Sequence, residues 1–238
     1  MHVTTKKEME SMNILGIENR TENWKTAVYF SPLFGAKSIN LVNRLGESPG
    51  PATEDVKLEL FWKGMRDFLH RDSEKKEPAR GQLKEAARGQ FVDLYLRLFP
   101  DLRTDIEKFG AFRNLKPHNY DVSTDERMAK LFDNLFNTEI DVVLETPDKL
   151  FIGEAKHEMG FGANSNLILV HQLMRQYVTA TILIEFSNNQ KEVVPFVVCD
   201  SDKKFLKTSQ VRFMISQGWL KKDNVLKWTE ISSLLRPL

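Results

Sequence analysis

The sequence predicts an α/β fold built around a mixed central sheet. Two short apolar runs, 140–144 and 150–155, are rich in β-forming residues and flank a turn. The stretch 166–186 contains neither proline nor glycine, so it can form a long helix. A further apolar run, 193–199, follows it. A hairpin, a helix and a strand in this order indicate a crossover helix between parallel strands.

From the sequence pattern we predict two parts: residues 1–77 form a helical or irregular extension, and this extension packs on a core formed by residues 78–238. Residues up to about Glu22 show little pattern, so we expect partial disorder there. The stretch 24–34 mixes aromatic residues with Pro32, which indicates packed irregular structure or a short helix. The strongest break in the chain is 48–53, Ser-Pro-Gly-Pro-Ala-Thr.

Two helices are expected after this break. The first covers 54–70, where apolar and polar residues alternate on what we interpret as a helical period, with Thr53 as its cap. The second covers 79–99 and is stopped by Pro100. Its apolar stripe consists of Leu83, Ala86, Ala87, Phe91, Leu94 and Leu98. Beyond it the pattern is weak, and we interpret 111–115 as a first strand and 124–136 as a helical turn or two.

The hairpin brings three charged side chains together. Thr146 to Lys149 reads as the turn, and counting outward from it places Asp141 beside Ile152 to Glu154 on the antiparallel neighbour. Side chains on a strand alternate between faces, so Glu154 and Lys156 point the same way. One face therefore gathers two carboxylates and one ammonium group.

This trio suits metal-assisted hydrolysis of a phosphodiester. Two carboxylates can hold Mg²⁺ or Mn²⁺, which prefer oxygen ligands, and such a cation polarises a phosphoryl oxygen and acidifies water. Lys156 can orient the water or stabilise the charge that builds on the phosphate.

The pattern resembles the PD-(D/E)xK nuclease superfamily, which includes many restriction endonucleases. Asp141 matches the acid of the first strand, and Glu154 and Lys156 match the (Asp/Glu)-x-Lys of the second; Ile140 replaces the proline. The resemblance implies a restriction endonuclease-like αβββαβ core and nucleic acid, DNA in the first instance, as partner. It implies Asp141 and Glu154 as metal ligands, with the Ala155 carbonyl as a further one. A monomer and a homodimer both stay open.

The resemblance also assigns roles beyond the hairpin. The segment 172–177, Gln-Leu-Met-Arg-Gln-Tyr, matches a helix element that lies beside the metal site in this superfamily. Gln172 would then support catalysis, with Arg175 and Gln176 on the nucleic acid; His171 reads as a packing or surface residue. A further acid is expected on a helix before the first strand, with Glu85 as first choice and Glu59 as alternative.

The composition excludes several kinds of site and several classes of protein. The single cysteine, Cys199, excludes an intramolecular disulfide and a cysteine-rich zinc site, and its apolar surroundings predict a buried, inert thiol. No run is long enough to span a membrane and no signal peptide opens the chain, so a cytoplasmic protein without a membrane partner is expected.

The net charge of +1 is unevenly distributed. Residues 201–238 contain eight lysines and arginines against three acids. Lys203 and Lys204 are the first of these cations and are candidates for contact with nucleic acid.

Two alternatives to a nuclease stay open. One is a nucleic-acid-binding or scaffolding protein that has the nuclease fold without turnover. The other is an unrelated α/β protein in which Glu154 and Lys156 form a surface pair.

Overall fold

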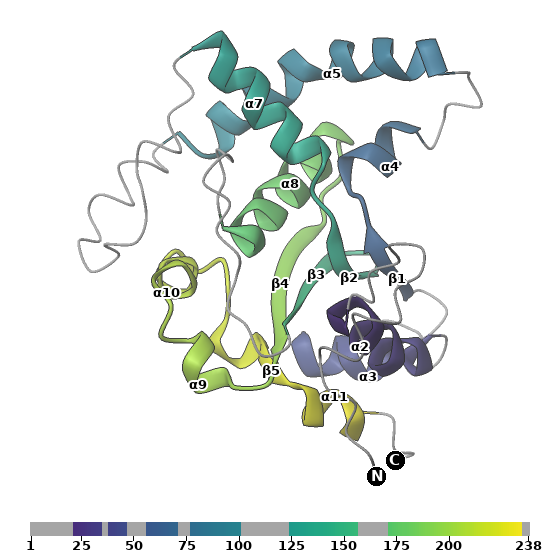
Figure 1. Ribbon diagram of the computed structural model, residues 1–238, viewed down its shortest axis with the longest axis vertical. Helices are drawn as coiled ribbons and strands as arrows, with labels where there is room; N and C mark the ends of the chain where they lie inside the picture. The colour runs from purple at the N-terminus through teal and green to yellow at the C-terminus, as the bar shows by residue number, and fades with distance from the viewer. Residues whose placement is uncertain are drawn as a thin grey trace, which may run out of the picture.

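A mixed five-stranded sheet forms the centre of the protein (Figure 1). The structure is a computed structural model, and it describes residues 21–34, 38–46, 56–70, 77–100, 124–156 and 171–234. In spatial order the strands are β1 (Lys57–Trp62), β2 (Ile140–Glu145), β3 (Lys149–Lys156), β4 (Glu192–Cys199) and β5 (Val225–Lys227). β2 is antiparallel to β1 and β3, whereas β3, β4 and β5 run parallel to one another. The α/β class and the mixed sheet predicted from the sequence are confirmed.

The β2–β3 hairpin has the predicted register. Val142 pairs with Gly153, so extending the ladder by one residue places Asp141 opposite Glu154. The turn is stabilised by Thr146, whose hydroxyl accepts from the Lys149 N–H at 3.0 Å and donates to the Asp148 carboxylate at 2.9 Å.

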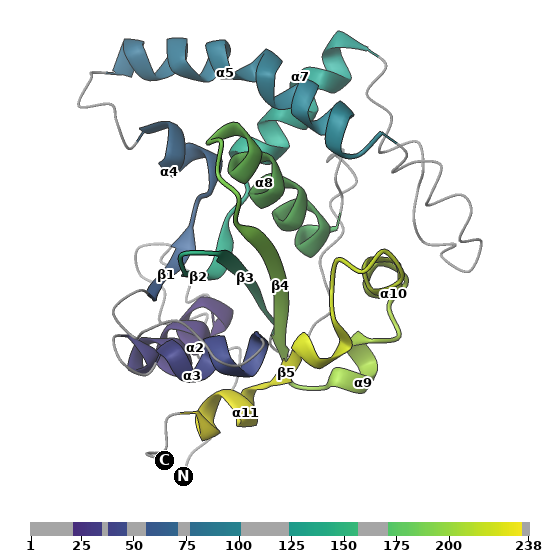
Figure 2. The ribbon, with the colours of Figure 1, turned by 180° about the vertical axis from the view of Figure 1, so that it is seen from behind.

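Helices cover both faces of the sheet. They are α2 (Thr21–Phe30), α3 (Ser38–Leu45), α4 (Met65–His70), α5 (Glu77–Leu98), α7 (Asp125–Phe136), α8 (Gln172–Phe186), α9 (Asp202–Phe205), α10 (Ser209–Ser216) and α11 (Trp228–Ser233), with short 3₁₀ turns η1 (Ser31–Leu33) and η5 (Lys222–Asn224). In Figures 1 and 2, α5 and α7 lie together at one end of the molecule, and α2, α3 and α11 lie together at the other.

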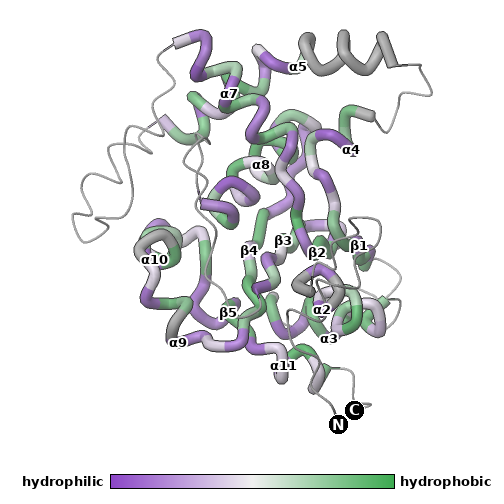
Figure 3. The backbone as a smooth tube through the Cα atoms, in the orientation of Figure 1, coloured by the Kyte–Doolittle hydropathy of each residue, from purple (hydrophilic) through white to green (hydrophobic). Residues whose placement is uncertain are grey.

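The alternation of side chains along the strands creates a separate core on each face. On β4, Phe196 and Val198 pack with α2, α3 and α11, whereas Val197 and Cys199 pack with α5, α7, α8 and α10. The backbone tube in Figure 3 is largely hydrophobic along β4, as expected for a strand buried on both sides. Cys199 is buried, as predicted, and burial raises the pKa of its thiol to about 11.

Gly153, beside the catalytic candidates, is a position where only glycine fits. A Cβ built there would lie 2.2 Å from the ring of Phe196, which is fully buried. We expect Gly153→Ala to lower the free energy of unfolding by about 1–3 kcal/mol, because the ring cannot move away from the overlap. Urea denaturation measures this. The matched control is Gly89→Ala in α5, where a Cβ meets nothing within 4 Å and should raise stability slightly. Equal effects of the two substitutions would contradict this packing account.

Several sequence predictions are corrected. The helix expected over 54–70 is wrong: within its described part, Lys57–Trp62 is strand β1, and only Met65–His70 is helical. The segment alternates with a period of two, and Leu58 and Leu60 face the core on the α2 and α3 side because β1 pairs with β2. β1 therefore contributes an edge strand from within the range predicted as an extension.

The helices that follow are closer to expectation. α5 corresponds to the predicted helix 79–99, although it follows the first strand of the sheet instead of preceding it. α7 is a full helix capped by Thr124, which accepts from the Arg127 N–H at 3.3 Å. The strand proposed for 111–115 lies outside the described residues.

The crossover helix α8 begins later than predicted. Residue 171 is not helical, and α8 starts at Gln172. The start proposed at residue 166 lies outside the described residues. Pro195 lies inside β4, at a point where β5 has not yet joined the ladder, and its carbonyl accepts from the Asn224 side chain at 3.2 Å.

Candidate active site

The two carboxylates and the lysine predicted from the hairpin converge at the end of β3. Glu154 Oε1 lies 2.5 Å from Lys156 Nζ. Asp141 Oδ2 accepts from the Ala155 N–H at 2.9 Å, which holds this carboxylate against β3. All three side chains are buried, with 0% of Glu154, 7% of Asp141 and 9% of Lys156 exposed.

Burial changes the acid–base character of Glu154. Its pKa is raised to about 8, first because burial penalises the charged form and second because the Asp141 carboxylate lies nearby. Lys156 and Gln176 act in the opposite direction by stabilising the carboxylate. Without a further positive charge, two neighbouring carboxylates in this environment cannot both be ionised cheaply.

Gln176 connects the helix to the site. Its amide nitrogen donates to Glu154 Oε2 and, at 2.9 Å, to the backbone carbonyl of Glu139, so α8 is tied to β3 and to the residue directly before β2. The sequence placed Gln172 in the catalytic role and Gln176 on the nucleic acid. The structure brings Gln176 to Glu154, whereas Gln172 is half-buried one turn earlier and makes no hydrogen bond to either carboxylate. The role assigned to Gln172 stays a prediction.

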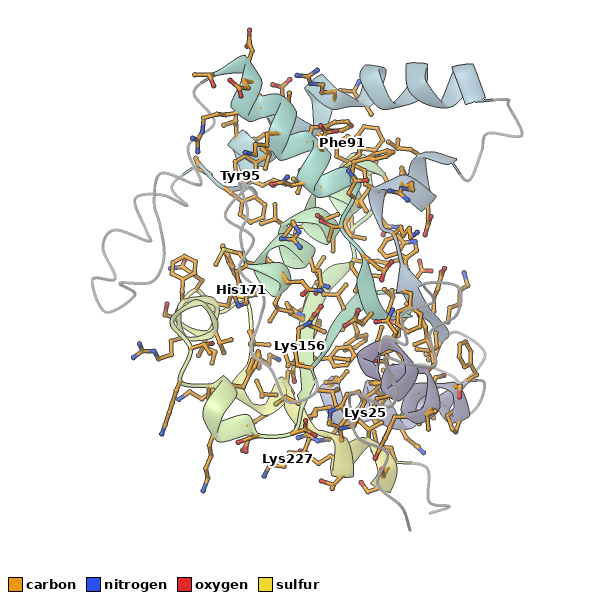
Figure 4. The ribbon with its side chains drawn as sticks, viewed as in Figure 1. Lys25, Phe91, Tyr95, Lys156, His171 and Lys227 are labelled. Carbon is orange, nitrogen blue, oxygen red and sulfur yellow. The ribbon has the colours of Figure 1, made fainter. Side chains whose placement is uncertain are left out.

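His171 begins the helix beside the site, and Figure 4 labels it together with Lys156. Its Nδ1 accepts from the Met174 N–H at 3.4 Å, which makes it the N-cap of α8. Burial, followed by the charges of Arg175 and Lys156, lowers its pKa to about 3, so the imidazole is neutral at physiological pH. The sequence left packing and surface roles open for His171, and the side chain is buried. Its capping role was missed because histidine is an unusual cap.

Arg175 adds a second cation near the carboxylates. It is half-buried, and the Glu154 carboxylate stabilises its charge, although burial lowers its pKa overall. Lys203, in contrast, is exposed on α9, and the side chain of Lys204 lies outside the described residues.

The backbone opposite Asp141 is strained. In the β1–β2 register Phe61 would face Asp141, but its φ is +58°, a left-handed conformation that bulky residues rarely adopt. Such outliers concentrate at functional sites, where the surrounding structure maintains them.

The donor set fits a divalent cation in part. Asp141 and Glu154 supply two carboxylates, and the other amide atom of Gln176, Oε1, is buried without a hydrogen-bond partner. Among the described residues no group of three or more His, Cys, Asp or Glu side chains is arranged to hold a metal.

The third acid expected from the sequence is corrected for Glu59 and stays a prediction for Glu85. Glu59 lies on β1 and not on a helix, and it is largely exposed. Partial burial, followed by the nearby Asp67 carboxylate, raises its pKa. Glu85 lies on α5 with a side chain outside the described part. The Ala155 carbonyl stays a predicted ligand.

A separate hollow of about 450 Å³ lies between α8, the start of β4 and the turn that follows α10. Tyr177, Trp219 and Pro195 contribute to its wall, and none of Asp141, Glu154 and Lys156 does. This hollow is therefore separate from the buried polar cluster of the candidate site.

Comparison with known proteins adds no identification: no family model matches the chain, and no curated protein or solved structure shows a significant match. Within the described residues no helix has the length and apolar character needed to cross a membrane.

Proposed function

We propose that the protein is a divalent-metal-dependent nuclease of the PD-(D/E)xK type that hydrolyses phosphodiester bonds in nucleic acid, with DNA as the first substrate to test. The observation that carries this proposal is Glu154, a fully buried carboxylate that faces a second carboxylate, Asp141, and contacts Lys156. Burying two acids together is costly, and perturbed groups of this kind concentrate at catalytic centres.

The arrangement of the sheet supports the same proposal. A helix, α3, precedes β1; three strands form an antiparallel meander; and α8 crosses over to the parallel strand β4. This order agrees with an αβββαβ restriction endonuclease-like core in which α4, α5 and α7 are inserted between the first two strands. The carboxylates lie on the second and third strands of this meander, β2 and β3.

The residues of the site divide the chemistry between them. A bound Mg²⁺ or Mn²⁺ would supply charge neutralisation and a more acidic water, and Asp141 and Glu154 would hold it. Lys156 places a positive charge where negative charge builds on the phosphate, and Arg175 adds a second. Gln176 fixes the Glu154 carboxylate, and the neutral His171 fixes the start of the helix that carries both Gln176 and Arg175.

A second candidate is a nucleic-acid-binding or scaffolding protein that does not cleave. It is favoured by the presence of only two carboxylates at the site among the described residues, and by the ion pair of Glu154 with Lys156, which balances its charge without a metal. The basic C-terminal region serves binding in either case.

The two candidates are separated by incubating the purified protein with single- and double-stranded DNA and RNA, with Mg²⁺, with Mn²⁺ or with EDTA. The nuclease proposal predicts products only with a divalent ion. Salt-sensitive binding without products under every condition would favour the second candidate.

A further inference from the structure

The carbonyl of Lys156 is held by a residue from the C-terminal part of the chain. Trp228, the first residue of α11, is buried, and its indole N–H donates to the Lys156 carbonyl oxygen at 3.2 Å. Lys156 is the last residue of β3, where pairing with β2 has already ended, so its carbonyl is satisfied by a side chain. The sequence gives no local sign of this contact, which spans 72 positions.

The indole ring is itself held by α2. Tyr29 lies 5.0 Å from it and Phe30 6.3 Å, measured between ring centroids, and Lys25 Nζ lies 4.8 Å from the ring centroid. Lys25 also forms a 3.0 Å ion pair with Asp200, the residue directly after β4. Figures 1 and 2 both show α2 and α11 near the same ends of the central strands, and Figure 4 labels Lys25 and Lys156.

We propose that Trp228 is a positioning residue for catalysis: it fixes the backbone of Lys156, and α2 fixes Trp228 through Lys25, Tyr29 and Phe30. This inference rests on the proposed nuclease function. A lysine side chain is long and has many rotamers, so the position of its ammonium group depends on how firmly its backbone is held. Misplacing a catalytic group by about 1 Å can slow a reaction about 100-fold.

A purely structural role for Trp228 makes a different prediction. Packing alone would alter the free energy of unfolding and leave the folded enzyme equally active. Positioning predicts a lower kcat with an unchanged KM, since Trp228 contacts the backbone of Lys156 and not the substrate. It also predicts faster amide exchange at the end of β3 under conditions where the protein stays folded.

The test compares Trp228→Phe with the parent. Phenylalanine keeps an aromatic ring against α2 and removes the N–H donor. The matched control is Trp219→Phe, the same change at a tryptophan that stacks on Tyr177, 5.0 Å away, and lies beside the separate hollow. Trp228→Phe should lower kcat about 10- to 100-fold with KM unchanged, and should speed hydrogen exchange at Ala155 and Lys156. Trp219→Phe should change neither.

A kcat and an exchange rate equal to those of the parent would overturn the proposal, as would equal changes in both variants. If Trp228→Phe does not fold, Lys25→Met decides, because it removes only the contacts of the Lys25 ammonium group with the ring and with Asp200 and leaves Tyr29 and Phe30 in place. This variant should shift exchange and kcat in the same direction by a smaller factor, and no shift overturns the proposal. Absence of cleavage by the parent would remove the nuclease function alone. The exchange comparison would then still decide whether Trp228 anchors the end of β3.

Discussion

Replacing Lys156 by methionine should reduce cleavage by about 100- to 1,000-fold, as for other groups that stabilise charge in a transition state. The ammonium group lies 2.5 Å from Glu154 and is the cation in direct contact with that carboxylate. Its loss also removes an interaction that lowers the pKa of Glu154, so the carboxyl would carry a proton over more of the neutral range and compete less well for a cation. Both effects act in the same direction.

Lys149→Met provides the control for this loss. Lys149 lies at the other end of the same strand and pairs with Glu192 at 3.4 Å, across β3 and β4, near the surface. Steady-state cleavage rates of both variants, with circular dichroism to confirm folding, give the comparison. Parent-like cleavage by Lys156→Met would remove Lys156 from the mechanism, and equal losses in the two variants would indicate a general effect of charge.

Replacing Glu154 by glutamine should stabilise the metal-free protein, increasingly so as the pH rises. The carboxyl has a pKa of about 8 in the folded state against 4.5 for an ordinary glutamate, so the native state binds more protons than the unfolded state between these values. The stability of the parent should therefore fall as the pH rises from about 4.5 to about 8 and change no further above that through this group. Glutamine does not titrate, so the variant should lack this part of the decline.

The size of this effect follows from about 1.4 kcal/mol for each unit of pKa difference, which amounts to several kcal/mol at pH 8. Urea denaturation at pH 5, 6.5 and 8 in EDTA measures it for the parent, for Glu154→Gln and for the exposed control Glu192→Gln. A Glu154→Gln variant that is less stable than the parent at pH 8 would show that the ion pair with Lys156 outweighs the cost of burial. The control should follow the parent at every pH.

The hairpin and its charged residues could be predicted because the relevant signals are local. Two apolar runs and a turn fix the register, and the period of a strand then places Glu154 and Lys156 on one face. The first strand was missed because Lys57–Trp62 is short and lies at an edge, and its conformation depends on pairing with β2, about 80 positions away.

The helix contribution to the site was predicted only in part. The sequence shows that Gln172 and Gln176 lie on one face of a helix. Which of these two residues reaches Glu154 depends on where the helix starts and on how it crosses the sheet. The start of the helix is set by His171, which caps it. The Trp228 contact and the complete burial of Glu154 arise from long-range packing, for which the sequence contains no periodic signal.

The most direct test of the account is a crystal structure of the protein soaked in Mn²⁺, with anomalous diffraction to locate the ion. The account predicts one Mn²⁺ coordinated by both Asp141 and Glu154. Lys156 should either move away from Glu154 or share that carboxylate with the ion. The Asp141→Asn variant should bind no ion at this site. An ion bound elsewhere, or no ion while Lys156 stays paired with Glu154, would contradict it.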